Sequence, residues 1–436
     1  MAASVRAAAR LVHARTLSAR ARLRPRSRVP TRLVAALAIL GPGLIAANAG
    51  NDAGGIATYS QVGAKYGYAL LWMMVVLTFS LIVVQEMAAR MGAVTGKGLA
   101  ELIREEYGVR WSIFATVSVL FANLGICISE FVGIGAALSL LHVPIQLSVP
   151  IAAVLVWLLV VRGSYKSAER VFVLMTIPFF AYPIAAVLSH PDWGEVGHAA
   201  VVPQIQLNGA YLLLFVATAG TTITPFMQLY LQSAVVERGI GPDGLKGERA
   251  EVATGSLFAN LVASFVIIAT AATLYVHGHR NVGSAADAAK ALEPFAGRFA
   301  EVIFAVGLLG ASLLAAAILP VTAAYVVAET FGFEKGISRR PSQAPVFVGV
   351  ITVLIAIGTV VAIIPGLPVI ELLVLVQVVN GVLLPVTLIF LWRLAANREL
   401  MGEYANGRIL NLLAGATVVA TSTLSVLVIL LSVGVI

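Results

Sequence analysis

A single carboxylate, Asp52, stands in the middle of the apolar stretch "GPGLIAANAGNDAGGIATYSQVG", residues 41–63. Six glycines and one proline accompany it, and each of them weakens a helix. An ionisable group inside a membrane-spanning segment is costly and marks an ion or substrate path. At a helix break, Asp52 would lie beside free backbone carbonyls, and such oxygen ligands suit Mg²⁺, Ca²⁺ and Mn²⁺. The stretch therefore predicts a cation site built from oxygen atoms.

A second apolar stretch, "LFVATAGTTITPFMQLYLQSAV" (residues 214–235), is interrupted in the same manner by Gly220, Thr224 and Pro225. Proline removes a backbone donor and clashes with the preceding turn. Non-helical backbone at membrane depth persists only where it lines a cavity or is buried in protein. Close packing of kinked helices is the alternative explanation of one such span. Two spans, one of which carries a carboxylate, favour a site.

Composition identifies the elements that must position these residues. The chain has 436 residues, of which 59% are hydrophobic and 11% charged, and its mean hydropathy is +0.95. Soluble proteins carry about 25% charged residues. The apolar runs are roughly 20 residues long, as membrane helices require, and lack the alternation of a transmembrane barrel. One cysteine, Cys127, excludes an intramolecular disulfide framework and a cysteine-rich metal site. We therefore expect an all-α integral membrane protein that is not an enzyme.

Eleven membrane spans are predicted from the apolar runs. Their ranges are 33–62, 68–92, 111–141, 146–161, 171–189, 209–236, 251–277, 299–331, 344–364, 369–392 and 409–434. The interrupted spans are the first and the sixth, which predicts two inverted repeats of five helices with the substrate site where the breaks meet. The predicted divisions are a tail (1–32), a first repeat (33–189), a second repeat (209–396) and an additional helix (397–436).

The distribution of basic residues predicts the orientation. With the N-terminus inside, 25 of the 29 Lys and Arg residues fall in cytoplasmic segments, so the C-terminus is expected outside. Nine arginines and no acidic residue lie in the tail, which we interpret as a cytoplasmic tail; an organellar targeting peptide or a start codon assigned too early are the alternatives. This pattern gives no reason to expect a nucleic-acid partner. We expect a monomer in the plasma membrane of a prokaryote.

From about Thr31 onward the chain resembles the natural resistance-associated macrophage protein (NRAMP) family of divalent metal transporters. The resemblance rests on Gly41-Pro42, "DAGG" (52–55), "VGAKYGYALLW" (62–72), "TGKGLAELIREEYG" (95–108) and further segments, namely "SEFVGIGAAL", "GTTITPF" and "NRELMG". It implies a LeuT-like fold, in which the broken helices one and six rock against a scaffold of helices three, four, eight and nine.

The resemblance also implies ligands for a transported divalent cation. These are Asp52, the Thr221 carbonyl, Thr224, Gln377 and the positions Gly55 and Asn51, with Glu130 as a proton relay or a support of the ligands. As an alternative, the Gln377 and Asn380 side chains link helices by hydrogen bonds. Either Asn48 or Asn51 would replace a missing asparagine, or satisfy freed backbone groups. Gln228 and Gln232 would line the inner vestibule.

Departures from the family pattern bear on the cargo. Gly55 stands where the family has asparagine, Thr224 where it has methionine, Phe226 where it has histidine, and Cys127 where it has an acidic residue. Loss of a soft thioether and of an amide ligand should enlarge the site and favour a partly hydrated Mg²⁺. Loss of His and Asp removes groups that relay protons.

We therefore expect a secondary transporter of Mg²⁺ that also accepts Mn²⁺, with absent or weak proton coupling, similar to the magnesium branch of the family. The alternative within the class is a proton-coupled Mn²⁺/Fe²⁺ importer. A cation channel is disfavoured because no filter loop is visible, and a membrane enzyme because no catalytic motif is found. No resident cofactor is expected; the cation is cargo, and the lipid bilayer is the other partner.

Overall fold

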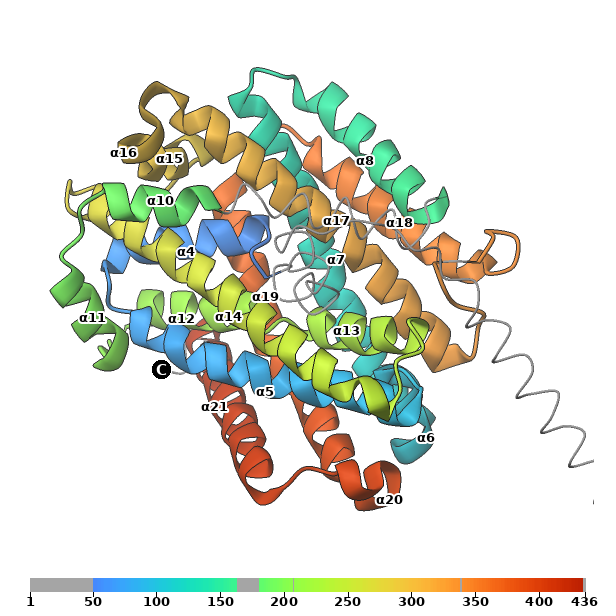
Figure 1. Ribbon diagram of the computed structural model, residues 1–436. Coiled ribbons are helices and arrows are strands. Elements are labelled where there is room, and N and C mark those ends of the chain that lie inside the picture. Colours follow the sequence, from blue (N-terminus) through green and yellow to red (C-terminus); the bar gives the residue numbers. More distant parts are fainter. Residues whose placement is uncertain (1–49, 163–179, 207, 338, 434–436) are drawn as a thin grey trace, which may run out of the picture. The chain divides into compact units, whose positions relative to one another are not determined.

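Long apolar helices dominate the computed structural model, which describes residues 50–162, 180–206, 208–337 and 339–433 (Figure 1). Within these residues, nine helical segments are long and apolar enough to cross a membrane. They are α5 (Leu71–Thr95), α7 (Val109–Leu140), α8 (Ile145–Arg162), α12 (Gly209–Thr222) with α13 (Pro225–Glu237), α14 (Leu245–Thr270), α17 (Ala300–Phe331), α18 (Pro345–Ala362), α19 (Val369–Ala396) and α21 (Arg408–Ser432).

These nine segments coincide with nine of the eleven predicted spans. The largest difference is in the seventh span, where α14 begins six residues before the predicted residue 251 and runs on into a π-helix, η3 (Ala271–Tyr275). The predicted first and fifth spans are described only in part, as α4 (Ala53–Tyr66) and α10 (Ala181–Leu188). The tail, Gly41, Pro42 and Asn48 lie outside the described residues.

Several shorter helices fill the links between spans, and the apolar-run pattern did not predict them. They are α6 (Leu99–Tyr107), α11 (Trp193–Val201), α15 (Ala285–Ala289), α16 (Glu293–Ala296) and α20 (Arg398–Met401). Helix α6 is amphipathic and buries Leu99, Leu102 and Ile103. It follows Gly96, which ends α5 with φ +66°, a left-handed conformation that glycine adopts without steric cost.

The start of α4, on the C-terminal side of the first predicted break, is present. Residues 50–52 form a turn and a bend, and α4 starts at Ala53 with Asp52 as its N-cap. The Asp52 carboxylate accepts a hydrogen bond from the Gly55 backbone N–H, one of the donors that a helix start leaves without an intrahelical partner. Helix α4 therefore begins directly after the residue that carries the charge.

The second predicted break is also present, and Figure 1 shows α12 and α13 following one another with a short gap. Helix α12 ends at Thr222, residues 223–224 are not helical, and α13 starts at Pro225. Proline suits the first position of a helix because its missing N–H would have no partner there. Pro225 thus starts a new helix and does not kink a continuous one.

The helices pack in two groups. Helices α7, α8, α17 and α18, the predicted third, fourth, eighth and ninth spans, contact one another. Helix α4 packs against α14 and α19, α12 against α19, and α13 against α5. The broken segments thus lie against α19 and their own neighbours, while the predicted scaffold helices pack on one another and join the first group through α7 on α19 and α17 on α13. The predicted repeat boundaries at 189, 209 and 396 stay predictions.

Candidate metal-binding site

Asp52 is fully buried at the N-terminus of α4. Its Oδ1 accepts a hydrogen bond of 2.5 Å from the Gly55 backbone N–H. The positive end of the helix dipole also favours a negative charge at this position. Two sources of stabilisation therefore offset part of the cost of burying a carboxylate.

Gln377 brings the middle of α19 to the same carboxylate. Its Nε2 lies 3.1 Å from Oδ1 and 3.2 Å from Oδ2 of Asp52, and its Oε1 accepts a 3.3 Å bond from Asn380 Nδ2. The amide presents its donor end to the negative charge. A half-turn of the same amide would present Oε1 to a cation beside Asp52. The structure thus brings together two of the predicted ligands.

The two breaks touch each other through Thr221. Its hydroxyl donates to the carbonyl of Gly50, which precedes Asp52, at 3.1 Å. Thr221 is fully buried and belongs to the last turn of α12. The structure thus brings the last turn of α12 against the turn before Asp52, through the Thr221 side chain. The predicted role of its carbonyl as a metal ligand stays a prediction.

Gly55 is a point of close approach. A Cβ placed on it would clash with the Gly50 carbonyl oxygen and lie 2.8 Å from Thr221 Oγ1. The expected enlargement of the site at this position is therefore wrong for this conformation, because backbone and Thr221 already occupy the space where an asparagine side chain would begin. Gly55 takes part through its N–H, which holds Asp52.

Thr224 lies in the second break as the residue before α13. Its side chain is fully buried, makes no capping bond, and its Oγ1 has no hydrogen-bond partner among the described residues. A buried hydroxyl without a partner is unfavourable unless a water or an ion satisfies it. Phe226, two residues on, is also fully buried and offers no ligand atom. Thr224 is thus available to a ligand from this break.

Glu130 approaches the site from α7. Its Oε2 accepts a 3.2 Å bond from the Ala53 backbone N–H, and its Oε1 accepts a 3.2 Å bond from the Ser129 hydroxyl. The residue is fully buried. Glu130 therefore contacts the residue that follows Asp52, at the start of α4, which fits the predicted supporting role; the relay role stays a prediction.

Asn51 is engaged elsewhere. Its Nδ2 donates to the carbonyl of Ala259 on α14 at 3.1 Å. This bond ties the first break to a neighbouring helix and occupies the amide nitrogen of Asn51, so the predicted use of its oxygen in place of the missing asparagine ligand stays a prediction. Asn380 likewise donates to the Gly220 carbonyl at 2.8 Å, which holds the end of α12 against α19.

One hydrogen bond beside the site was not anticipated from sequence. The Tyr59 and Thr222 hydroxyls lie 2.9 Å apart, and both side chains are buried. Thr222 also donates to the Thr218 carbonyl at 2.7 Å, the turn-internal bond that threonine commonly makes in membrane helices. Tyr59 lies seven residues after Asp52, two turns along α4. This spacing is the one feature of the sequence that could have pointed to Tyr59 as a neighbour of the site.

The predicted ligand set is that of a hard cation. Among the described residues, no group of three or more His, Cys, Asp and Glu side chains could hold a metal ion. Asp52 is the charged member of the predicted set, and Gln377 contacts it through its amide nitrogen. The ligand roles of Gln377, Thr224 and Thr221 stay predictions. Magnesium and manganese accept carboxylate and neutral oxygen ligands, whereas zinc sites rely on Cys and His.

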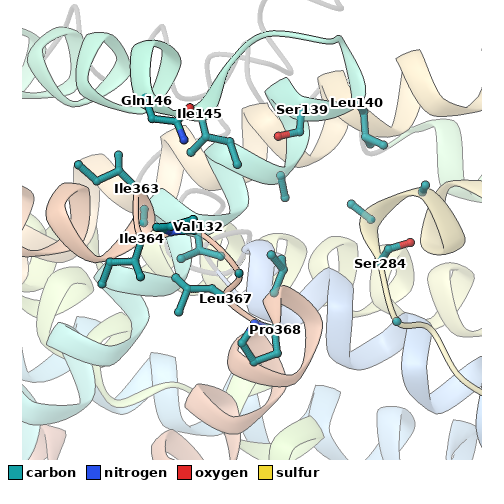
Figure 2. Close-up of a pocket in the computed structure, with 18 residues that line it drawn as sticks. Val132, Ser139, Leu140, Ile145, Gln146, Ser284, Ile363, Ile364, Leu367 and Pro368 are labelled. Atoms are coloured by element: carbon teal, nitrogen blue, oxygen red, sulfur yellow. The ribbon is translucent and has the colours of Figure 1, made fainter.

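A large cavity elsewhere is not this site. A cavity of about 450 Å³ lies among residues of α7, the start of α8, residues 283–286 and the link between α18 and α19. Figure 2 draws the residues that line it. Its lining is mostly apolar, with Val132, Leu140, Ile145, Ile363 and Leu367 among the residues drawn. None of the predicted ligands lines it. Its chemistry does not suit a divalent cation, which needs oxygen donors.

Comparison with known proteins agrees with this geometry. The family model described as "Natural resistance-associated macrophage protein-like" matches residues 43–431. A relative named divalent metal cation transporter MntH, from Ralstonia nicotianae, is 30% identical over 405 residues, covering 87% of each chain.

Solved structures show the same fold. A manganese transporter of Eremococcus coleocola, crystallised with an aromatic bis-isothiourea compound, superposes with a TM-score of 0.75 at 20% identity, over 92% of this chain and 88% of that one. MhsT, in complex with L-phenylalanine, superposes with a TM-score of 0.61 at 14% identity, over 93% and 99%. The chain therefore belongs to the natural resistance-associated macrophage protein (NRAMP) family.

Proposed function

We propose that this protein carries divalent metal cations across a membrane by alternating access, with Asp52 as the charged ligand and Mn²⁺ as cargo. The observation that carries the proposal is the buried carboxylate at the point where two broken helices touch. The names of its relatives, a divalent metal cation transporter and a manganese transporter, support the cargo.

The geometry suggests how the ion is bound. A cation beside Asp52 neutralises a buried charge that is now met by the Gly55 N–H and the Gln377 amide. The Gln377 amide then turns its oxygen to the ion, and the free hydroxyl of Thr224 completes the oxygen set from the second break. Because both breaks supply ligands, the ion couples the half-helices α4 and α13, and their joint movement exposes it to one side at a time.

A second candidate cargo is Mg²⁺, and a specific observation favours it. Thr224 provides a hard hydroxyl where the family resemblance implies a soft thioether, and Gly55 provides no side chain at all. Magnesium keeps several of its waters when bound and needs few protein ligands. The relatives named above are not described as magnesium transporters, so their names favour Mn²⁺.

Proton coupling is the other open property. Among the described residues, Glu130 is a carboxylate that contacts the Asp52 segment, through a hydrogen bond from the Ala53 N–H. A proton carried with the metal would need a group that titrates on this path, and Glu130 is the candidate in the described chain. We propose Glu130 as that group if transport moves protons.

Uptake into liposomes tests the proposal. Purified protein is reconstituted with a metal-sensitive dye or a pH dye inside, and Mn²⁺ or Mg²⁺ is added outside. We expect saturable Mn²⁺ uptake, and a loss of at least about 100-fold in Asp52→Ala, since even groups that only support metal ligands are worth 10–100-fold. Asp243→Ala, which removes an exposed acidic residue, is the matched control.

The outcomes separate the candidates. Equal uptake by Asp52→Ala and the unaltered protein would remove the site from the mechanism. Uptake of Mg²⁺ in preference to Mn²⁺ would make Mg²⁺ the cargo. Metal-driven acidification that disappears in Glu130→Gln would establish coupling through Glu130.

A further inference from the structure

Helix α13 carries a row of polar side chains on one face. Thr224, Gln228 and Gln232 are spaced four residues apart, so they stack along the helix over about 12 Å. All three are fully buried. The row begins at the second break and points along α13 toward the end that the Lys and Arg distribution places inside.

Each side chain in the row has an oxygen without a hydrogen-bond partner among the described residues. The nitrogen ends are held in place: Gln228 Nε2 donates to the Thr224 carbonyl at 3.2 Å, and Gln232 Nε2 donates to the Lys97 carbonyl at 2.9 Å. Fixing the nitrogen of an amide also fixes the direction of its oxygen. The arrangement therefore offers three acceptor oxygens, and the bonds to the amide nitrogens orient the two that belong to Gln228 and Gln232.

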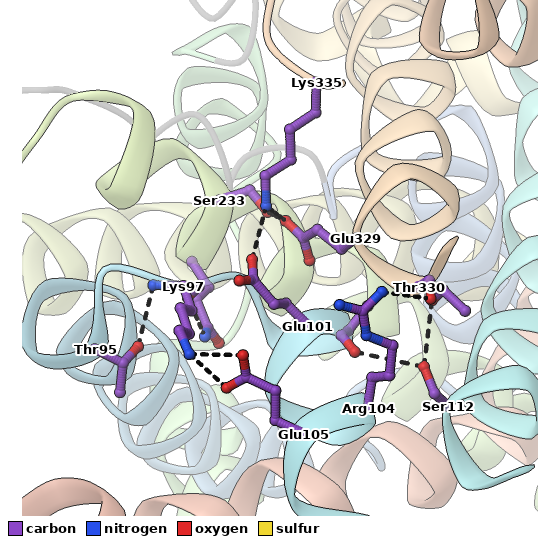
Figure 3. Close-up of polar contacts among 12 residues, drawn as sticks. Thr95, Lys97, Glu101, Arg104, Glu105, Ser112, Ser233, Glu329, Thr330 and Lys335 are labelled. Carbon is purple, nitrogen blue, oxygen red and sulfur yellow. Dashed lines mark hydrogen bonds and ion pairs between the residues drawn. The ribbon is translucent and has the colours of Figure 1, made fainter. Parts of the chain in front are cut away.

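The row ends beside a buried carboxylate. Ser233, the residue after Gln232, donates to Glu329 Oε1 on α17 at 3.0 Å, and the other oxygen of Glu329 has no partner in the described chain. Figure 3 shows Lys335 reaching the same place, with Nζ 3.2 Å from Glu329 Oε1 and 3.1 Å from Glu101 Oε2. A cavity of about 250 Å³ adjoins Ser233, Glu329 and Lys335.

We propose that the oxygens of Thr224, Gln228 and Gln232 form an exit path for a partly hydrated divalent cation, which leads from Asp52 to Glu329. The proposal rests on the function proposed above. Neutral oxygens bind the hydrated ion weakly, through its waters, so the ion can enter the path and leave it again, as conduction requires. The Lys335 ammonium, which is paired with Glu329, occupies the end of this path until the metal ion arrives.

Buried glutamines also serve as plain links between helices, and the chain contains one for comparison. Gln85 on α5 is fully buried, but its Oε1 accepts a bond from the Ser256 hydroxyl at 3.3 Å. Its oxygen is therefore occupied, unlike those of Gln228 and Gln232. Gln85 supplies a matched control for the effect of replacing a buried glutamine.

The test compares binding with transport. Gln228→Met, Gln232→Met and the double variant keep the side-chain length but remove the oxygen. Mn²⁺ binding to purified protein is measured by calorimetry, and the initial rate of Mn²⁺ uptake is measured in liposomes. We expect dissociation constants and half-saturation concentrations within twofold of the unaltered protein, and a maximal rate reduced about tenfold, as a modestly higher barrier gives.

Three results would overturn the exit path. Unchanged maximal rates in both single variants would show that the oxygens are not used. Weaker binding in step with slower transport would place the glutamines in the binding site. An equal loss in Gln85→Met would reveal a general packing effect. If the unaltered protein neither binds nor carries Mn²⁺ or Mg²⁺, the proposed function fails and takes the exit path with it. Should the double variant not fold, the single variants carry the test.

Discussion

The two breaks differ in how their polar groups are satisfied. In the first, the Asp52 carboxylate accepts bonds from the Gly55 N–H and the Gln377 amide. In the second, the Thr224 hydroxyl has no partner among the described residues. Both segments are buried at the same depth of packing, so burial alone does not explain the difference.

Charge explains it. A buried carboxylate without donors costs far more than a buried hydroxyl without a partner, so the first break must be satisfied even before an ion arrives. The second break can leave an oxygen open for the ion. The comparison suggests that Asp52 provides binding energy, whereas Thr224 adjusts which ion is preferred.

The largest expected effect tests this difference directly. Asp52→Asn keeps the shape of the side chain but removes its charge, and we expect Mn²⁺ transport to fall at least about 100-fold. Thr224→Ala removes one neutral oxygen and should cost only about tenfold. Uptake assays in liposomes measure both. Equal losses in the two variants would contradict the assignment of the binding energy to Asp52.

Crowding at the contact between the breaks should have the next largest effect. Gly55→Ala places a methyl group against the Gly50 carbonyl and Thr221 Oγ1, and overpacking of this kind costs about 1–3 kcal/mol. We expect a lower unfolding temperature in detergent together with slower transport. Gly247→Ala is the control, because a Cβ there meets nothing within 4 Å. A fully stable and active Gly55→Ala protein would show that the breaks separate readily.

A change of ion preference is the third prediction. Thr224→Met introduces a soft thioether at the open position of the second break, so the affinity for Cd²⁺ should rise about tenfold, while that for Mg²⁺ should not. Competition of Cd²⁺ with Mn²⁺ uptake measures the change. Thr224→Ser, which keeps the hydroxyl, should leave the ratio unaltered. An unchanged affinity for Cd²⁺ in Thr224→Met would show that Thr224 does not face the ion.

Much of this architecture was predictable from sequence because local chemistry determines it. Glycine and proline set the positions of both breaks, and runs of apolar residues set the nine described spans. Asp52 stood out because a lone charge in an apolar run has few structural explanations. These inferences use only neighbours along the chain.

Long-range partners were less accessible. The family resemblance implied that Gln377 and Asp52 meet across 325 residues, but no residue pattern specified the bond from Asn51 to Ala259 across 208. The loss of a side chain at Gly55 suggested a larger site, but the neighbouring backbone closes into that space. The sequence shows that position 55 lacks a side chain, whereas the packing of neighbouring atoms determines whether that space stays open or is filled.

The smallest expected effect concerns support of the second break from α4. Thr222 donates to the Thr218 carbonyl, so the Tyr59 hydroxyl must be the donor in the bond between the two side chains. Tyr59→Phe removes that bond and should lower the free energy of unfolding by about 1 kcal/mol. Transport should stay within twofold, because Tyr59 holds α12 and supplies no ligand. Thermal unfolding in detergent and Mn²⁺ uptake together decide this: slow transport by a fully stable Tyr59→Phe protein would instead place the hydroxyl on the ion's path.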